Sequence, residues 1–483
     1  MNQKQVEETS KQSKPSFGRD LTTGSIPRHL VAFSLPMLAG SALQTAYSFV
    51  NAIWVGKFLG TDALAAVTVS FPVVFVLIAL GAGLTVATNI LISQYYGAGN
   101  LGQLRKVIDS STILIVVLSL ALLIVGELFT PHILKAMDTP PNVLPMAIQY
   151  MRIFLLSLPF GFGLFLVRNM LQGIGDSKTP LYFQSAGLLL TIALDPVLMF
   201  GLIGFPKLGL NGTAWATGIT HALAFFALVI YLHKKNNPVA PYWRSARMDW
   251  PTAFTTIRIG VPSAVQQSLI SVGMVFVIGI VNSFGETATA AFGAVGRVDQ
   301  LAFLPAMSFS LAISTLSGQN IGANKLDRIR EIFKWGCLLS GGVTLLGTAI
   351  VVGMPNLLLR IFVNDPVVIN IGVSYLHIAG PLYICFAIMF VTNGIINGAG
   401  HTIVTTVISL ISLWIVRVPL AYWLSGKLDS VVGVWYAMAL SFFVSMICSY
   451  AYYRSGRWKK PVTRVKPVPA TPEAAFGDEV GEI

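Results

Sequence analysis

Two carboxylates lie within long apolar stretches of this 483-residue chain, Asp195 and Asp299, and both could carry proton or ion chemistry. A charge at the centre of an apolar helix costs at least about 2.5–3.5 kcal/mol, so each acid needs a reason to be there. Pro196 follows Asp195, removes a backbone donor and frees carbonyls beside the carboxylate. Burial disfavours the charged form of such a group. We expect Asp195 to load and release a proton near neutral pH; a carboxyl capped for packing alone is the alternative.

Neutral polar groups recur at helical spacing around this acid. Thr191 precedes Asp195 by one turn, and Thr213 opens a neighbouring apolar segment. Gln44, Tyr47 and Asn51 would share one face of another helix, and a polar stripe on an apolar helix should face the bundle interior. The candidate proton-coupling residues are therefore Asp195, Asn51, Thr191 and Thr213, with ordinary interhelical hydrogen bonds as the alternative.

Asp299 follows Arg297 by two positions, and residues two apart do not face each other on a helix. Arg297 is typical of a fixed ion pair across helices, whereas Asp299 could contact substrate or take part in coupling. The candidate substrate contacts are Gln44, Tyr47, Asn169, Arg297 and Asp299.

Composition requires that these residues be positioned by membrane helices. The chain is 54% apolar and 11% charged, with a mean hydropathy of +0.72. Apolar runs of about 20 residues predict transmembrane helices, since barrel strands would alternate. The twelve expected spans are 30–56, 64–90, 110–131, 146–170, 180–204, 209–232, 254–283, 288–316, 333–356, 370–395, 403–425 and 431–453.

The two halves of the chain repeat with an offset of 225 positions. Gly60 and Gly285, Gln94 and Gln319, and Tyr150 and Tyr375 are matched pairs. Six spans per half is an even number, so the halves enter the membrane in the same sense and their pseudo-two-fold axis follows the membrane normal. The expected division is an N-terminal segment (1–28), an N-lobe (29–232), a linker (233–253), a C-lobe (254–455) and a flexible tail (456–483).

Positive charge orients the helices. Of the 32 Lys and Arg residues, 22 fall in segments on the side that carries both termini and 5 in loops on the other. The positive-inside rule therefore predicts cytoplasmic termini in a multi-pass protein of the cell (inner) membrane. Membrane topology and contact with anionic lipid headgroups explain the net charge of +12 better than nucleic-acid binding does. Prolines recur by half, and we expect Pro36 and Pro262 to act as matched hinges.

Other chemistry has little support. The three cysteines are far apart and the six histidines lack metal-ligand spacing, so we expect no cofactor and no metal. An intramembrane enzyme would need a second catalytic group beside Asp195, and none is evident.

Motifs along the whole chain resemble the multidrug and toxic compound extrusion (MATE) transporters. The likeness covers about residues 20–455 and depends on the order and spacing of short stretches. They are FSLPMLAGSALQTAYSFVNAIWVGKFLG (33–60), SQYYGAGN (93–100), RNMLQGIGDSKTP (168–180), LDPVLMFG (194–201), GQNIGANK (318–325) and RVPLAY (417–422). The resemblance implies an all-α exporter with two six-helix lobes around a V-shaped cleft, in which organic cations leave in exchange for protons or sodium ions.

The resemblance also implies site residues. Similar proton-coupled members place a helix-5 aspartate in an N-lobe pocket, and that position matches Asp195, with Thr213 as a neighbour. This chain has Asn51 where the family usually has an aspartate, which leaves one acid in any relay. Around Ser268–Ser271 it lacks the glutamate of the NorM-type branch, so it resembles the DinF-like branch and sodium coupling is disfavoured.

We therefore expect a monomeric, proton-coupled multidrug exporter that works by alternating access. Three alternative functions would also make the chain a membrane transporter. They are a sodium-coupled drug antiporter, a lipid or lipid-linked oligosaccharide flippase of the same superfamily, and a major facilitator carrier. A flippase would gather cations in a central cavity, for which the candidates are Arg152, Arg168, Arg297 and Arg417. GAGNLGQLRK (97–106) lacks the acid of the major facilitator signature, which disfavours that family.

Overall fold

The computed structural model describes residues 18–242 and 246–460, and within these ranges all regular elements are helices. Twelve of the helices described there are long and apolar enough to cross a membrane, which confirms the predicted number. Large apolar side chains point outward from them: Phe71, Leu189 and Phe254 are 62%, 68% and 68% exposed. An apolar outer surface of this kind requires lipid around it.

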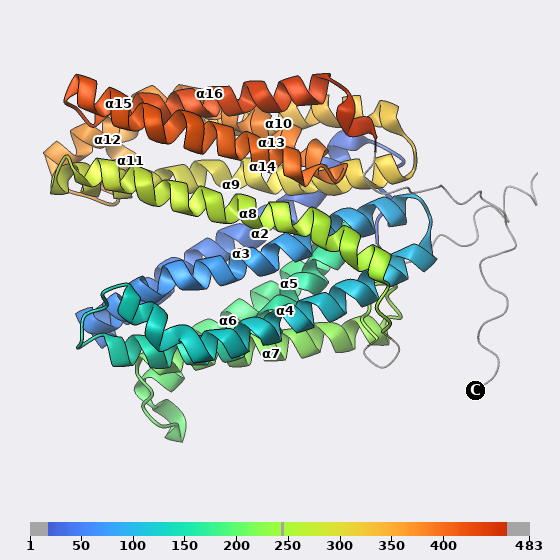
Figure 1. Ribbon diagram of the computed structural model, residues 1–483, viewed down its shortest axis with the longest axis horizontal. Helices are drawn as coiled ribbons and strands as arrows, with labels where there is room; N and C mark the ends of the chain where they lie inside the picture. Colours follow the sequence, from blue (N-terminus) through green and yellow to red (C-terminus); the bar gives the residue numbers. More distant parts are fainter. Residues whose placement is uncertain (1–17, 243–245, 461–483) are drawn as a thin grey trace, which may run out of the picture.

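The helices form two bundles of six spans each (Figure 1). The N-lobe contains α2 (Ile26–Trp54, continued as a π-helix over Val55–Leu59), α3 (Thr61–Gly97), α4 (Leu101–Ala136), α5 (Leu144–Gly173), α6 (Lys178–Phe200) and α7 (Leu210–Lys234). The C-lobe contains α8 (Trp250–Asn282), α9 (Glu286–Gly322), α10 (Leu326–Gly353), α11 (Pro355–Arg360), α12 (Pro366–Ala379), α13 (Tyr383–Gly398), α14 (Thr402–Leu410), α15 (Val418–Leu428) and α16 (Val432–Arg454). The first helix of each lobe also packs on the other lobe, α2 on α9 and α8 on α3.

Several helices differ in extent from the apolar runs that predicted them. The third span was expected from residue 110, yet α4 begins at Leu101, where the Asn100 side chain accepts a hydrogen bond from the Gln103 amide. An apolar run marks the part of a helix that lies in lipid, and a polar, capped turn can extend the helix beyond it. The tenth and eleventh spans are interrupted, by a 3₁₀ turn at Gly380–Leu382 and by a π-helix at Ile411–Arg417.

The lobes meet closely at the end of the molecule where residues 18–25 and 455–460 lie, which we call the terminal end. The Gln94 side-chain amide donates to the Gly398 carbonyl at 2.8 Å, and its counterpart Gln319 donates to the Gly173 carbonyl at 2.9 Å. Gln94 and Gln319, like Gly173 and Gly398, are 225 positions apart. The two hydrogen bonds are therefore equivalent contacts between the lobes, related by the pseudo-two-fold axis. Only glycine fits beside these bonds: a Cβ on Gly97 would lie 2.0 Å from the Gln319 carbonyl oxygen.

The segment that leads into α2 crosses this junction. The Arg19 amide donates to the Ile174 carbonyl of the N-lobe at 2.8 Å, and the Leu21 amide donates to Oε1 of Gln319 in the C-lobe at 3.0 Å. Lys325, at the start of α10, donates to the Thr22 carbonyl at 2.9 Å. Residues 18–25 therefore join the two lobes, while the part of the expected N-terminal segment before residue 18 lies outside the described residues.

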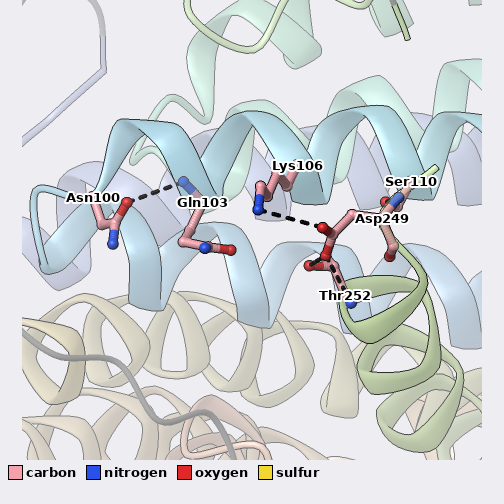
Figure 2. A network of polar contacts seen from close by, with 6 residues as sticks. All are labelled: Asn100, Gln103, Lys106, Ser110, Asp249 and Thr252. Atoms are coloured by element: carbon pink, nitrogen blue, oxygen red, sulfur yellow. Dashed lines mark hydrogen bonds and ion pairs between the residues drawn. The ribbon is translucent and has the colours of Figure 1, made fainter. Parts of the chain in front are cut away.

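The linker into α8 is held in the equivalent place on the N-lobe. Asp249 caps α8 through the Thr252 amide and hydroxyl, and it pairs with Lys106 of α4 at 3.3 Å (Figure 2). Its own amide donates to the Ser110 hydroxyl at 3.1 Å. The Thr252 hydrogen bonds, together with the Lys106 ammonium, hold the pKa of Asp249 below its usual value. Each lobe thus anchors the segment that leads into the first helix of the other.

The C-terminal tail begins later than expected. Residues 457–459 form a 3₁₀ turn, and the Trp458 ring, 2% exposed, stacks on Tyr453 with centroids 5.7 Å apart. Its indole N–H donates to the Tyr453 carbonyl at 2.8 Å. Residues 456–460 therefore belong to the packed C-lobe, and residues 461–483 lie outside the described ones.

Candidate proton and substrate sites

Asp195 lies on α6 with no solvent-exposed surface. The Tyr47 hydroxyl of α2 donates to its Oδ2 at 3.3 Å, whereas its Oδ1 is enclosed and has no hydrogen-bond partner among the described residues. None of the ion pairs found in residues 18–242 and 246–460 includes it. Tyr150 of α5 lies within electrostatic range. Asp195 is thus a loosely bound carboxyl that lacks a cationic partner in the described part of the chain.

The depth of Asp195 differs from the sequence-based expectation. The expected span over 180–204 puts Asp195 about ten residues from its far end, but α6 ends at Phe200, so Asp195 lies five residues from the end that faces away from the termini. An aromatic cluster covers this end: the Phe58 ring centroid is 5.1 Å from that of Trp54 and 5.5 Å from that of Phe200. These rings belong to the adjoining ends of α2 and α6.

The hydroxyls expected beside Asp195 bond elsewhere. Thr191 donates to the Gly187 carbonyl at 2.9 Å and Thr213 to the Leu210 carbonyl at 2.9 Å, each within its own helix. Serine and threonine often bond back in this way on a helix, which spacing alone does not reveal. Asn51 lies one turn beyond Tyr47 on α2, and its side-chain oxygen is enclosed without a partner among the described residues.

A cavity of about 530 Å³ lies beside Asp195 inside the N-lobe. Tyr47 and Gln44 line it, so two of the expected substrate contacts face the same space. Its walls also include Thr217, which lies against the Tyr47 hydroxyl, and an aromatic set of Phe154, Phe162, Phe165 and Phe183. The volume falls within the usual range of about 300–1,000 Å³ for small-molecule sites.

Two ionisable residues of this cavity were not among the candidate sites. Arg168 of α5 and His221 of α7 both line it, yet in the sequence each stands in an apolar run beside one neutral polar residue, Asn169 and Thr220 respectively. Arg168 appeared only in the set of arginines considered for a flippase. The available signal for Arg168 was a cation within an apolar helix, which needs a reason as much as a carboxylate does.

Asn169 does not line the cavity. Its side chain donates to the Phe165 carbonyl at 2.9 Å, and its own carbonyl accepts from Asn89 at 3.0 Å. Asn89 in turn accepts from Thr315 of the C-lobe at 3.3 Å. Asn169 therefore belongs to a chain of hydrogen bonds between the lobes.

Asp299 lies in the C-lobe, apart from Asp195. The Tyr375 hydroxyl donates to its Oδ2 at 2.6 Å, and the Tyr383 hydroxyl donates to its Oδ1. Both tyrosines are fully buried, and Arg417 lies within electrostatic range of the carboxylate. Two hydroxyls thus hold the carboxyl group in one orientation, an arrangement typical of a structural centre.

The four arginines considered for a flippase have four separate surroundings. Arg152 pairs with Glu127 at 3.3 Å, and Arg168 lines the N-lobe cavity. Arg417 donates to the Ser441 hydroxyl at 2.7 Å. Arg297 lies over the rings of Phe49 and Phe362. The Arg297 guanidinium is 5.8 Å from the Phe49 centroid and 5.6 Å from that of Phe362, so it bridges α2 and the C-lobe through cation–π contacts. The ion pair expected for Arg297 is absent from the described residues.

The candidate hinge prolines lie at matched contacts. The Pro262 carbonyl accepts from Thr406 of α14 at 2.8 Å. One turn after each proline, α2 and α8 are bridged to the fifth helix of their lobe: Gln184 donates to the Gly40 carbonyl at 3.3 Å and Gln266 to the Ser409 hydroxyl at 2.7 Å. Gln184 and Ser409 are again 225 positions apart, so both hinges would bend against equivalent contacts.

A family model and individual relatives both match this chain over most of its length. The family model described as MatE matches residues 36–197 and 262–423, one match in each half. The chain is 35% identical over 465 residues to "Probable multidrug resistance protein YoeA" of Bacillus subtilis, covering 95% of this chain and 98% of that protein. It is 25% identical over 451 residues to the "FAD transporter" of Shewanella oneidensis, covering 92% and 97%.

Solved structures share the fold. One described as "Crystal structure of MATE in complex with MaL6" superposes with a TM-score of 0.86 at 23% identity, covering 92% of this chain and 98% of that one. At this identity the likeness establishes the twelve-helix, two-lobe architecture.

Proposed function

The chain belongs to the MatE family of multidrug efflux transporters, and from its N-lobe geometry we propose that it antiports amphipathic organic compounds against protons by alternating access. The observation that carries this proposal is Asp195, an enclosed carboxyl with one long hydrogen bond and no ion-pair partner in the described chain. Such a group can change protonation state without breaking a salt bridge. The cationic cargo that the family resemblance implies stays a prediction, and the proposal requires only an amphipathic organic compound.

The cycle follows from the placement of the acid. A proton from the outer side neutralises Asp195, and the neutral carboxyl lets the pocket between α2 and α6 lose water. The α2 helix then bends at Pro36, the adjoining cavity changes shape and the substrate leaves outward. The inward-facing state releases the proton. The membrane potential supplies about 2.3 kcal/mol per charge per 100 mV, to which the pH difference adds.

The contact between the lobes fits one state of this cycle. The paired bonds of Gln94 and Gln319 hold the terminal end shut. With the termini in the cytoplasm, as the charge distribution predicts, the structure corresponds to a state closed toward the cytoplasm.

The test is transport by purified protein in vesicles, with proton and sodium gradients imposed separately. Accumulation of rhodamine B, a dye with both a cationic and an anionic group, should follow the proton gradient in the wild type. Asp195→Asn should abolish that response while the melting temperature stays close to the wild-type value. Asp62→Asn is the matched control, because Asp62 is an exposed acid at the start of α3. Proton-driven accumulation that survives Asp195→Asn would refute the assignment, and a response to sodium alone would replace it with the sodium-coupled alternative.

A further inference from the structure

The N-lobe cavity has a charge opposite to what an organic cation would require. Among the residues that line it are one arginine, Arg168, and one histidine, His221, but no aspartate or glutamate. Asp195 is hidden behind the wall, where the Tyr47 hydroxyl contacts it and no surface of the carboxyl is exposed. A ligand in this space therefore meets a fixed positive charge.

Arg168 differs from Arg105, Arg152 and Arg417 in having no hydrogen-bond or ion-pair partner among the described residues. Arg105 pairs with Asp109 at 2.7 Å, Arg152 with Glu127 and Arg417 with Ser441. For Arg168 the described chain offers no hydrogen bond and no ion pair, although its side chain is partly buried within an apolar helix bundle. A guanidinium carries five N–H donors in a planar fork suited to a carboxylate or sulfonate. Its donors are thus available to something that enters the cavity.

His221 adds a second unsatisfied polar group. Its Nδ1 is enclosed and has no partner within the described residues, and a Cβ on Gly161 would lie 3.2 Å from this atom. The absence of a side chain at Gly161 leaves room for the ring at the cavity wall. A buried polar atom left unpaired is destabilising, and a ligand or water that bonds to it removes that penalty.

The cavity also has the length and lining for an aromatic body. Phe154 and Arg168 both line it and are fourteen positions apart on α5, which corresponds to about 21 Å along the helix axis. Phe162 and Phe165 line the cavity between these two positions of α5, and Phe183 of α6 lines it as well. An elongated aromatic molecule can lie along this wall with one end at Arg168 and the other near Tyr47.

We propose that the N-lobe cavity binds aromatic compounds that carry a carboxylate or sulfonate, including zwitterions, and that Arg168 is the specificity-determining residue that binds the anionic group. This inference rests on the proposed function for the view that the cavity serves substrates. It goes further in naming the substrate class: an amphiphile with an anionic group at one end, to which a cationic centre at the other end is no obstacle.

The test compares two dyes that differ in one group, rhodamine B with its free carboxylate and rhodamine B ethyl ester. Binding to the purified protein is measured by fluorescence anisotropy in nanodiscs of phosphatidylcholine, so that no anionic lipid competes. We expect the acid to bind at least about tenfold more tightly than the ester. Arg168→Gln should remove that preference by weakening the acid about tenfold with little effect on the ester, and Arg168→Lys should retain part of it.

Arg152→Gln is the matched control, since Arg152 lies on the same helix but pairs with Glu127 outside the cavity. Equal binding of acid and ester by the wild type, or a preference that survives Arg168→Gln, would overturn the proposal. If Arg168→Gln does not fold, the wild-type comparison and Arg168→Lys still decide. These are equilibrium measurements without a gradient, so a failure of proton coupling at Asp195 would leave their outcome unchanged and the two proposals fail separately.

Discussion

The tight backbone contact between the lobes predicts that a single methyl group can open the terminal end. A Cβ on Gly97 would lie 2.0 Å from the Gln319 carbonyl oxygen, and one on Gly322 would lie 1.9 Å from the Gln94 carbonyl oxygen. Both neighbours are backbone atoms, which a rotamer change cannot move. Gly97→Ala or Gly322→Ala must therefore push the lobes apart by at least about 1 Å to reach a tolerable separation.

The magnitude follows from the bonds that this shift would break. A displacement of about 1 Å lengthens the Gln94–Gly398 and Gln319–Gly173 hydrogen bonds, now 2.8 and 2.9 Å, beyond the range in which they are effective. Each bond contributes about 1 kcal/mol net, so the closed state loses about 2 kcal/mol relative to the open one. That changes the ratio of closed to open molecules by a factor of about 30.

The assay is electron–electron resonance distance measurement between nitroxides on the two lobes. Leu101→Cys at the start of α4 and Glu331→Cys in the first turns of α10 place exposed labels at the terminal end, in a background without Cys337, Cys385 and Cys448. Gly97→Ala should move the main population to a longer distance. Gly293→Ala is the control, because a Cβ there meets nothing within 4 Å. Identical distributions for wild type and Gly97→Ala would refute the reasoning.

Two further predictions concern stability. Tyr375→Phe removes the 2.6 Å donor to Asp299 and should lower the free energy of unfolding by about 1–3 kcal/mol, seen as a lower melting temperature. Tyr150 is at the matched position, and its hydroxyl has no hydrogen-bond partner among the described residues, so Tyr150→Phe should change the melting temperature little. Equal effects of the two substitutions would contradict a structural role for Asp299. Asp249→Asn weakens the cap of α8 and its pairing with Lys106. Because the folded-state pKa of Asp249 is lowered, chiefly by the Thr252 hydroxyl, its contribution is present above about pH 4 and is lost as the pH falls through the folded-state pKa. The difference in melting temperature between wild type and Asp249→Asn should therefore be present at pH 7 and shrink toward pH 3; a constant difference would argue against it.

The architecture was predictable because lipid allows few solutions. Apolar runs, an even number of spans per half and the 225-residue offset predict two parallel six-helix lobes. Helix ends were less accessible, since α4 extends nine residues before its apolar run through a polar turn capped by Asn100. The contacts of the segment that leads into α2 (residues 18–25) could not be predicted either, because its hydrogen bonds to Gln319 and Lys325 join positions about 300 apart in the chain.

The candidate site was predictable in part. The spacing of Gln44 and Tyr47 places both on the cavity face, and Tyr47 contacts Asp195. The spacing of Thr191 and Thr213 could not show that their hydroxyls bond within their own helices. Arg168 and His221 come from two other helices, and their convergence on one cavity depends on tertiary packing that no local pattern reports.

The duplicated scaffold carries acids that are not duplicated, and under the proposed proton coupling this asymmetry indicates which lobe would respond. Tyr150 and Tyr375 occupy matched positions, but they face acids on different helices. Tyr375 donates to Asp299, which is on the second helix of the C-lobe, whereas Tyr150 lies near Asp195, which is on the fifth helix of the N-lobe. Asp299 accepts hydroxyl bonds at both oxygens, so a change in its protonation would disrupt a bonded centre. Asp195 has one bond of 3.3 Å and one enclosed, unpartnered oxygen, and little opposes its protonation. We infer that the N-lobe changes with the proton while the C-lobe serves as the fixed body against which it moves.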